Sequence, residues 1–406
     1  MAFNTAISGL NAASTSLNVI GNNVANASTN GFKQSRAEFS DVYPVSNFGI
    51  AKNTAGVGVK VDAIIQQFTQ GNVNFTNNQL DLAINGNGFY RLSDNGAIVY
   101  TRAGGFGMDS NGYIRNSNGL RLTGYQADVN GNISGALGEL QASLADIAPR
   151  ATTNSDIGVN LDATALAPVP AFNPAVPASY NNATSMNIYD SLGSSHLVTM
   201  YFRKTAANSW ESRVYDEAGN ALGTTTLTFN GAGALTQVNG LPAPPSTDAY
   251  ILTPTNGANP VNFTFDYGQS TQYGGGFGVN FLTQDGYTTG RLVSVSIDNE
   301  GVLSSVYSNG QSQVQGQIVL SNFINPQGLQ PNADTAWLET SSSGVPLTGA
   351  PGSASLGLIQ SGALEESNVN LTEQLVYMIT AQRNFQANAQ VITTENAITQ
   401  TIINIR

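Results

Sequence analysis

Two runs of evenly spaced apolar residues, one at each end of the chain, constrain this sequence more than any other feature. Near the start, Phe3, Leu10, Leu17 and Val24 recur every seven residues, and no charged side chain precedes Lys33. Seven-residue spacing places such residues on one stripe of an α-helix. A stripe of this kind must be buried against a partner. We therefore predict an amphipathic helix at each end and assembly of several copies, which would cover both stripes.

The two helices have recognisable ends. The first is expected over about residues 2–27, with Asn30-Gly31 as its stop, because glycine tolerates the left-handed conformation that follows a helix. The second is expected over about residues 371–405, where Asn370 caps the first turn and Glu373 completes a capping-box spacing. The apolar residues predicted to pack between helices or between copies are Phe3, Ile7, Leu10, Leu17, Ile20, Val24, Leu371, Leu375, Met378, Phe385, Ile392 and Ile403.

Composition argues against several classes of function. Charged residues make up 10% of the chain, against about 25% in an average soluble domain. The net charge is −11 and no cluster of Lys and Arg occurs, so nucleic-acid binding is not expected. There is no cysteine and His196 is the lone histidine, which argues against disulfides, thiolate sites and a histidine metal cage. We expect no enzyme, no catalytic residue, no metal and no cofactor.

Membrane insertion is not expected either, because the apolar runs are short and interrupted. The first residues lack the basic start and the continuous apolar core of a secretory leader. If the protein leaves the cytoplasm, we expect a route without a cleaved signal peptide.

Between the helices the sequence favours β-hairpins. Asn-Gly pairs lie between strand-like runs, and Asn-Gly favours a tight turn whose two central residues both have positive φ. Five prolines within residues 146–185 mark a boundary or covering loop. The Asn-Gly pairs are Asn95-Gly96, Asn111-Gly112, Asn118-Gly119 and Asn130-Gly131.

These patterns predict a multi-domain α+β fold with a nested layout. Antiparallel, coiled-coil-like terminal helices (residues 1–30 with 365–406) would form one domain, and residues 31–71 an extended connector with a short strand near Val57–Val61. Two mainly antiparallel β-domains would follow, a middle one (72–145 with 286–364) and an inserted outer one (146–285).

Two motifs resemble the signatures of the bacterial flagellar rod and hook axial protein family. The first is NNVANASTNGFK at residues 22–33, and the second comprises GALEESNVNL at 362–371 and AQRNFQAN at 381–388. Further similar stretches, such as NGNGFY at 85–90 and GQIVLSNF at 316–323, extend the resemblance over most of the chain. The motif positions are Asn23, Ala25, Asn26, Thr29, Gly31, Phe32, Lys33, Ser367, Asn368 and Val369.

Within that family, the length and the large insertion are similar to those of the subunits that form the hook. The resemblance implies an extracellular, hollow, curved tube of many copies that joins rod to filament, transmits motor torque as a universal joint and encloses the export channel. The implied partners are other copies of the chain, the rod and hook–filament junction proteins, the hook cap and the flagellar type III export apparatus. Uncharged polar residues of the second helix, Gln382, Gln386, Asn388 and Gln390, are candidates to face the channel.

Two alternatives stay open at this point. A distal rod subunit of the same family would share both end motifs. A secreted β-rich adhesin or glycan binder would fit the composition, but it would leave the uncharged terminal heptads unexplained.

Overall fold

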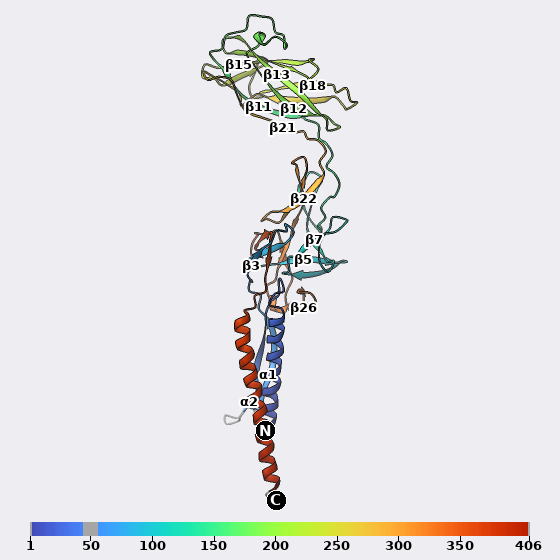
Figure 1. The fold of residues 1–406 in the computed structure, drawn as a ribbon, viewed down its shortest axis with the longest axis vertical. Coiled ribbons are helices and arrows are strands. Elements are labelled where there is room, and N and C mark those ends of the chain that lie inside the picture. The colour runs from blue at the N-terminus through green and yellow to red at the C-terminus, as the bar shows by residue number, and fades with distance from the viewer. Residues whose placement is uncertain (1, 44–55, 405–406) are drawn as a thin grey trace. The chain divides into compact units, whose positions relative to one another are not determined.

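The computed structural model describes residues 2–43 and 56–404. The chain forms two compact units (Figure 1). Unit 1 comprises Met1–Leu144, Ser294–Val306 and Ser312–Arg406, and unit 2 comprises Ala145–Val293 and Tyr307–Gln311. The terminal helices and several sheets of the described part match the predicted α+β class.

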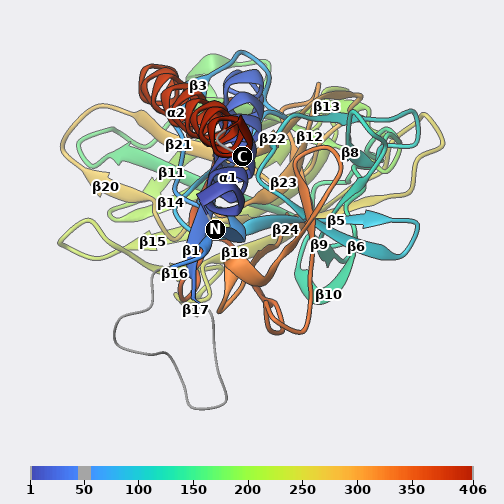
Figure 2. The ribbon, with the colours of Figure 1, turned by 90° about the horizontal axis from the view of Figure 1, so that it is seen from below.

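Two long helices, α1 (Ala2–Ala25) and α2 (Leu371–Asn404), belong to unit 1. The Oδ1 atom of Asn370 accepts hydrogen bonds from the amides of Thr372 and Glu373, and so caps α2 as predicted. The helices lie side by side in both views (Figures 1 and 2). Neither described helix has an apolar stretch long enough to cross a bilayer.

The segment expected to be an extended connector contains more regular structure than the sequence suggested. Strands β1 (Ser35–Val42) and β2 (Gly58–Gln66) form an antiparallel ladder, with a register shift between Glu38 and Phe39. Residues 44–55, which join them, lie outside the described residues. The shift leaves Asp62 of β2 as an extra residue that opposes no residue of β1, which is a β-bulge.

The largest sheet has 13 strands in the described part of the chain and belongs mainly to unit 1. Its path runs β22-β23-β24-β9-β5-β6-β27-β26. The path strands are β22 (Leu292–Ile297), β23 (Val302–Tyr307), β24 (Ser312–Ile318), β9 (Arg121–Ala127), β5 (Phe89–Asp94), β6 (Ala97–Thr101), β27 (Ala336–Leu338) and β26 (Gln330–Asn332). The others are β7 (Phe106–Met108), β8 (Ile114–Asn116), β10 (Ile133–Glu139), β25 (Leu320–Asn322) and β28 (Leu347–Gly349).

Two short ladders of unit 1 join segments that are far apart in the sequence. β3 (Val73–Phe75) pairs with β30 (Ala363–Glu365), and β4 (Leu82–Asn85) pairs with β29 (Leu358–Ser361). These pairings hold the chain that leads into α2 against the strands that follow β2.

Unit 2 contains two sheets around one apolar core. The six-stranded sheet has the order of its sequence, and the five-stranded sheet has β11 at its centre, paired in parallel with β19 and β20. Trp210, Phe202 and Phe265 are fully buried in this core. The strands are β11 (Asn154–Asp162), β12 (Asn182–Tyr189), β13 (Ser195–Ala206), β14 (Ser209–Tyr215), β15 (Ala221–Phe229), β16 (Leu235–Val238), β17 (Leu241–Pro242), β18 (Thr247–Leu252), β19 (Val261–Asp266), β20 (Thr271–Tyr273) and β21 (Gly278–Gln284).

The Asn-Gly turns correct one prediction. Only Asn95-Gly96 has positive φ at both residues (49° and 102°). In the other three pairs only the glycine does, and an Asp or Asn two residues before the Asn-Gly pair accepts two backbone hydrogen bonds; Asp109 Oδ1, for example, accepts from Asn111 and Tyr113. These are three-residue loops that end in a glycine bulge. The signal for them is an Asp or Asn three residues before the glycine.

Candidate functional site

The residues of the two end motifs meet where α1 ends and α2 begins. After α1 the chain turns at Gly31, whose φ is 70° and whose backbone amide donates a 2.8 Å hydrogen bond to the carbonyl of Glu365. A Cβ at position 31 would lie 2.4 Å from the backbone nitrogen of Ala103. Glycine is therefore required there both by the left-handed backbone and by the close approach of another chain segment.

A buried cluster of three charges forms the centre of this junction. Lys33 Nζ lies 2.5 Å from Glu365 Oε1, and Arg102 Nη1 lies 3.0 Å from Glu365 Oε2. At most 4% of any of the three side chains is exposed. Burial lowers the pKa of Lys33, against the opposing effect of the neighbouring Glu365 carboxylate. Each charge is thus removed from water and compensated inside the protein.

Backbone groups complete the coordination of these charges. Lys33 Nζ also donates to the Thr69 carbonyl at 2.8 Å, and Arg102 Nη2 donates to the Gly86 carbonyl at 2.8 Å. The Gly71 amide donates to Glu365 Oε1 at 2.9 Å. The cluster therefore joins the segment after α1, the segment between β2 and β3, the residues that directly follow β4 and β6, and strand β30.

A second polar network fixes the ends of both helices. Asn23, which is buried in α1, donates to the Ser35 carbonyl at 2.8 Å and to Gln374 Oε1 of α2 at 3.1 Å. Asn368 Oδ1 accepts a hydrogen bond from the backbone amide of Gln34 at 2.8 Å. Side-chain amides thus pair with backbone groups of Gln34 and Ser35, where β1 begins.

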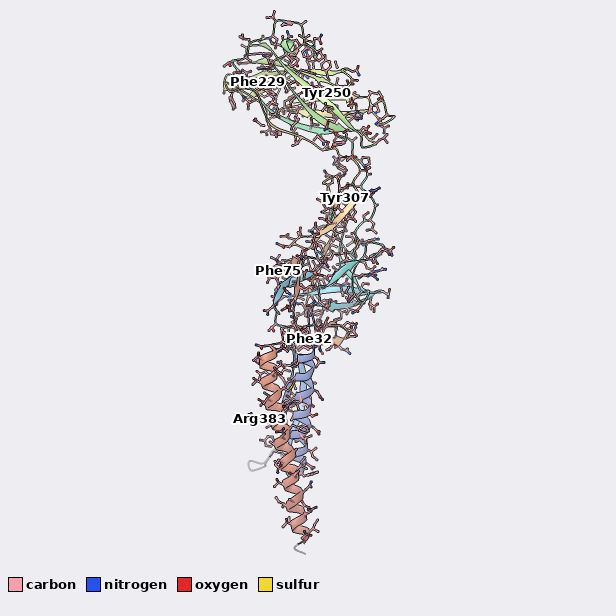
Figure 3. All side chains as sticks on the ribbon, viewed as in Figure 1. Phe32, Phe75, Phe229, Tyr250, Tyr307 and Arg383 are labelled. Carbon is pink, nitrogen blue, oxygen red and sulfur yellow. The ribbon has the colours of Figure 1, made fainter. Side chains whose placement is uncertain are left out.

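The other motif residues have clear positions. Asn26 accepts a hydrogen bond from Thr29, and Ser367 is buried and accepts from the amide of Val369. Ala25 is exposed and Val369 is half-buried. Phe32, which is labelled in Figure 3, is half-buried. It lines a 360 Å³ cleft with Lys33 and Trp337.

The seam between the helices is made of smaller and more polar residues than the sequence suggested. Ala6, Ala13, Ile20 and Asn23 are buried on α1, and Gln374 and Ala381 are buried on α2. A Cβ at Gly9 would lie 2.5 Å from Asn388 Oδ1. Small residues therefore allow a close approach of the two helices.

The predicted packing residues divide into two groups. Ile20 is buried, and Leu10, Leu17, Val24, Met378, Phe385 and Ile392 are half-buried. Phe3, Ile7, Leu371, Leu375 and Ile403 are exposed, each to 37–66%. The first group packs within the chain, while the second leaves apolar surface that the described residues do not cover.

The four candidate channel residues do not share one environment. Gln382, Gln386 and Gln390 are exposed, but Asn388 is half-buried beside Gly9. Asn388 therefore lies at the contact with α1, while the three glutamines face away from buried surface. Only Glu373, Arg383 and Glu395 are charged in α2, and Figure 3 shows Arg383 on this helix.

A groove of about 550 Å³ lies between α1, α2 and the start of β1. Its lining includes Val19, Ile20, Ala37, Tyr377 and Ala381. In the described part of the chain, no three His, Cys, Asp or Glu side chains gather in a way that could hold a metal ion. The arrangement at the chain ends is thus a set of packing surfaces around a buried ionic junction.

Comparisons with known proteins agree along the whole chain. Family models match as follows: "Flagella basal body rod protein" at residues 3–33, "Flagellar hook protein FlgE/F/G D1 domain" at 83–166, "Flagellar basal body protein FlaE D2 domain" at 160–287 and "Flagellar basal body rod FlgEFG protein C-terminal" at 360–405.

The similar proteins are named flagellar hook protein FlgE. The chain is 41% identical to the flagellar hook protein FlgE of Escherichia coli (strain K12) and 40% identical to that of Salmonella typhimurium, over 100% of both chains in each case. Identity to FlgE of Borreliella burgdorferi is 34% over 98% of both chains. The crystal structure of Helicobacter pylori flagellar hook protein FlgE2 has a similar fold, with a TM-score of 0.54 and 15% identity, over 72% of this chain and 100% of that one.

Proposed function

This chain belongs to the flagellar hook protein family and is a structural subunit of the hook rather than an enzyme, and we propose that it polymerises into a hollow curved tube. In this proposal the tube joins rod to filament, transmits motor torque as a universal joint and encloses the export channel. Its location is the extracellular hook of the bacterial flagellum.

One observation carries the proposal. The motifs from both chain ends converge in one buried junction, while Leu371, Leu375 and other large apolar residues of the same helices stay exposed. The junction gives the helix pair a fixed attachment, and the exposed residues give it adhesive surface. Burying the exposed half of each such side chain between copies would contribute about 1 kcal/mol, which is about half the value for full burial.

We propose that the terminal helices pair as an antiparallel, coiled-coil-like inner domain (1–30 with 365–406). Supporting this direction, Gly9 of α1 lies beside Asn388 and Asn23 bonds to Gln374, so positions rise along α1 as they fall along α2. The nested layout adds the middle domain (72–145 with 286–364) and the outer domain (146–285). The β3–β30 and β24–β9 pairings support the nesting, because each joins an early strand to a late one.

The proposed partners follow from the same assembly. Copies of the chain bind one another, and the ends of the tube bind the rod and the hook–filament junction proteins. Assembly takes place beneath the hook cap after passage through the flagellar type III export apparatus, without cleavage of a signal peptide. Gln382, Gln386 and Gln390 face the channel in this proposal.

Negative-stain microscopy of salted-out protein tests the polymerisation. The wild-type chain should form tubes, and Leu375→Asp should not, because a charge at this half-exposed position opposes burial between copies. Leu375→Met is the matched control and should assemble. Monodisperse wild-type particles that bind glycan would favour an adhesin instead, and normal tubes of Leu375→Asp would contradict the role of the exposed face.

A further inference from the structure

The heptad series of α2 continues beyond the last residue of α2 that is buried or half-buried. Buried or half-buried residues follow one another along α2 at alternating spacings of four and three, from Gln374 to Glu395. The next heptad of this series contains Ile402, whose exposed fraction is 64%. Ile398 (50%) and Ile403 (66%) beside it are exposed as well. Residues 396–404 carry no charge, so we call them the α2 plug.

A groove lies toward the opposite end of the helix pair. The 550 Å³ groove described above, which we call the socket, has α1 residues such as Val19 and Ile20, and Tyr377, Thr380 and Ala381 of α2, in its lining. Its size suits a few aliphatic side chains. Its lining is mostly uncharged, with Arg36 and Glu373 as the ionisable groups apart from Tyr377.

The plug of a molecule cannot fill its own socket. Thr380 and Ile402 lie in the same helix, and 22 residues of α-helix separate them by about 33 Å. A second copy of this chain, in contrast, presents an identical plug. The contact between α1 and α2 indicates how a plug could pack on another copy, because the plug continues the heptad positions of α2 that already pack against α1.

We propose that the α2 plug of one copy docks into the socket of a second copy. This inference rests on the proposed polymerisation and names the contact that directs it. Plug and socket lie at different positions of one helix and are not self-complementary. A head-to-tail contact of this kind generates an open helical filament where its rotation does not close a ring, whereas a self-complementary contact stops at a dimer.

Disulfide trapping tests the contact. The chain has no cysteine, so an Ile402→Cys, Thr380→Cys double variant contains only the two introduced thiols. A disulfide needs Cα atoms within about 7 Å, and the straight helix prevents an intramolecular bond. Oxidised tubes should give a ladder of cross-linked oligomers on a denaturing gel. The control pairs Ile402→Cys with Gln386→Cys, an exposed residue outside the socket, and should give no ladder.

A second measurement decides the case if the cysteine variants assemble poorly. Ile398→Ser with Ile402→Ser should raise the critical concentration for tube formation at least tenfold and leave monomer unfolding unchanged. Tubes without a ladder from the 402/380 pair, or an unchanged critical concentration, would overturn the plug contact while leaving polymerisation intact. Absence of tubes from the wild-type chain would overturn both proposals.

Discussion

Glu365 binds two cations with one carboxylate in a place that water does not reach. Removal of charges from water costs several kcal/mol per ion, and only well-placed partners offset that cost. Lys33 and Arg102 supply the ion pairs, and backbone carbonyls and an amide supply the remaining hydrogen bonds. The junction is therefore sensitive to the loss of any single member.

Glu365→Gln should destabilise unit 1 by about 3–5 kcal/mol, because it leaves two buried cations without an anion. Urea unfolding of the full chain, followed by a signal from unit 1, measures the change. Glu139→Gln is the matched control, since its ion pair with Arg121 is partly exposed, and it should have little effect. Equal losses in the two variants would show that the junction does not depend on its charge.

The lowered pKa of Asp190 predicts that acid reduces the stability of unit 2. Burial acts to raise its pKa, but hydrogen bonds from His196, Asn256 and the amides of Ser194 and Leu192 outweigh this effect and hold the pKa at about 2, below its ordinary 3.8. The unfolded chain therefore binds this proton at a higher pH than the folded chain does. The stabilisation is complete above about pH 5 and is lost as the pH falls toward 2.

Thermal unfolding of unit 2 between pH 5 and pH 2 should show this loss. Asp190→Asn should be less stable than the wild type at pH 5, and its stability should fall less steeply with acid. Asp128→Asn, in an exposed hairpin turn of unit 1, is a control that should leave the unit 2 profile unchanged. Parallel acid profiles of the wild type and Asp190→Asn would contradict the assignment.

At the scale of elements, local signals predicted both helices to within about two residues. Heptad spacing and the Asn370 cap are properties of short segments, so they are readable without the fold. Heptad spacing does not show which of two neighbouring rows of residues on α1 faces α2. Size favoured the line of Phe3 and Leu10, yet the structure buries Ala6 and Ala13, because close helix packing requires small side chains.

The ion pairs of the junction could not be predicted from the sequence, for a different reason. Lys33 and Glu365 both lie in recognised motifs, but 332 positions separate them, and no local pattern pairs a cation with a distant anion. The hairpin loops were partly readable. The Asn-Gly pairs predict where the loops lie, while the acceptor at Asp109 or Asp128 selects the longer loop type.

Because α2 packs against α1 along only part of its length, its resistance to local unfolding should differ along the helix. In the monomer, amides of residues 396–404 should exchange with solvent much faster than those of residues 374–395, because only the latter pack against α1. In assembled tubes the difference should shrink. Hydrogen exchange with mass spectrometry measures both states, and strand β13 serves as the internal reference. Full protection of both end segments in a monomer that does not associate would contradict assembly through these helices.

At the scale of the whole molecule, the proposed channel wall must let other polypeptides pass. Gln382, Gln386 and Gln390 are exposed and uncharged, so they offer an unfolded chain only weak, exchangeable hydrogen bonds. In this proposal the passengers include further copies of this chain, each with a net charge of −11. Lysines repeated on every copy would attract such passengers along the entire length of the tube.

Replacement of all three glutamines by lysine should therefore slow filament growth without preventing tube formation. Labelled filaments followed over time give the growth rate, and electron microscopy of isolated hooks shows whether the tube forms. The triple Gln→Asn variant keeps the uncharged amides and should grow at the wild-type rate. If the lysine variant grows as fast as the asparagine variant in cells with normal hooks, these residues do not face the channel, and another surface of the helix pair must line it.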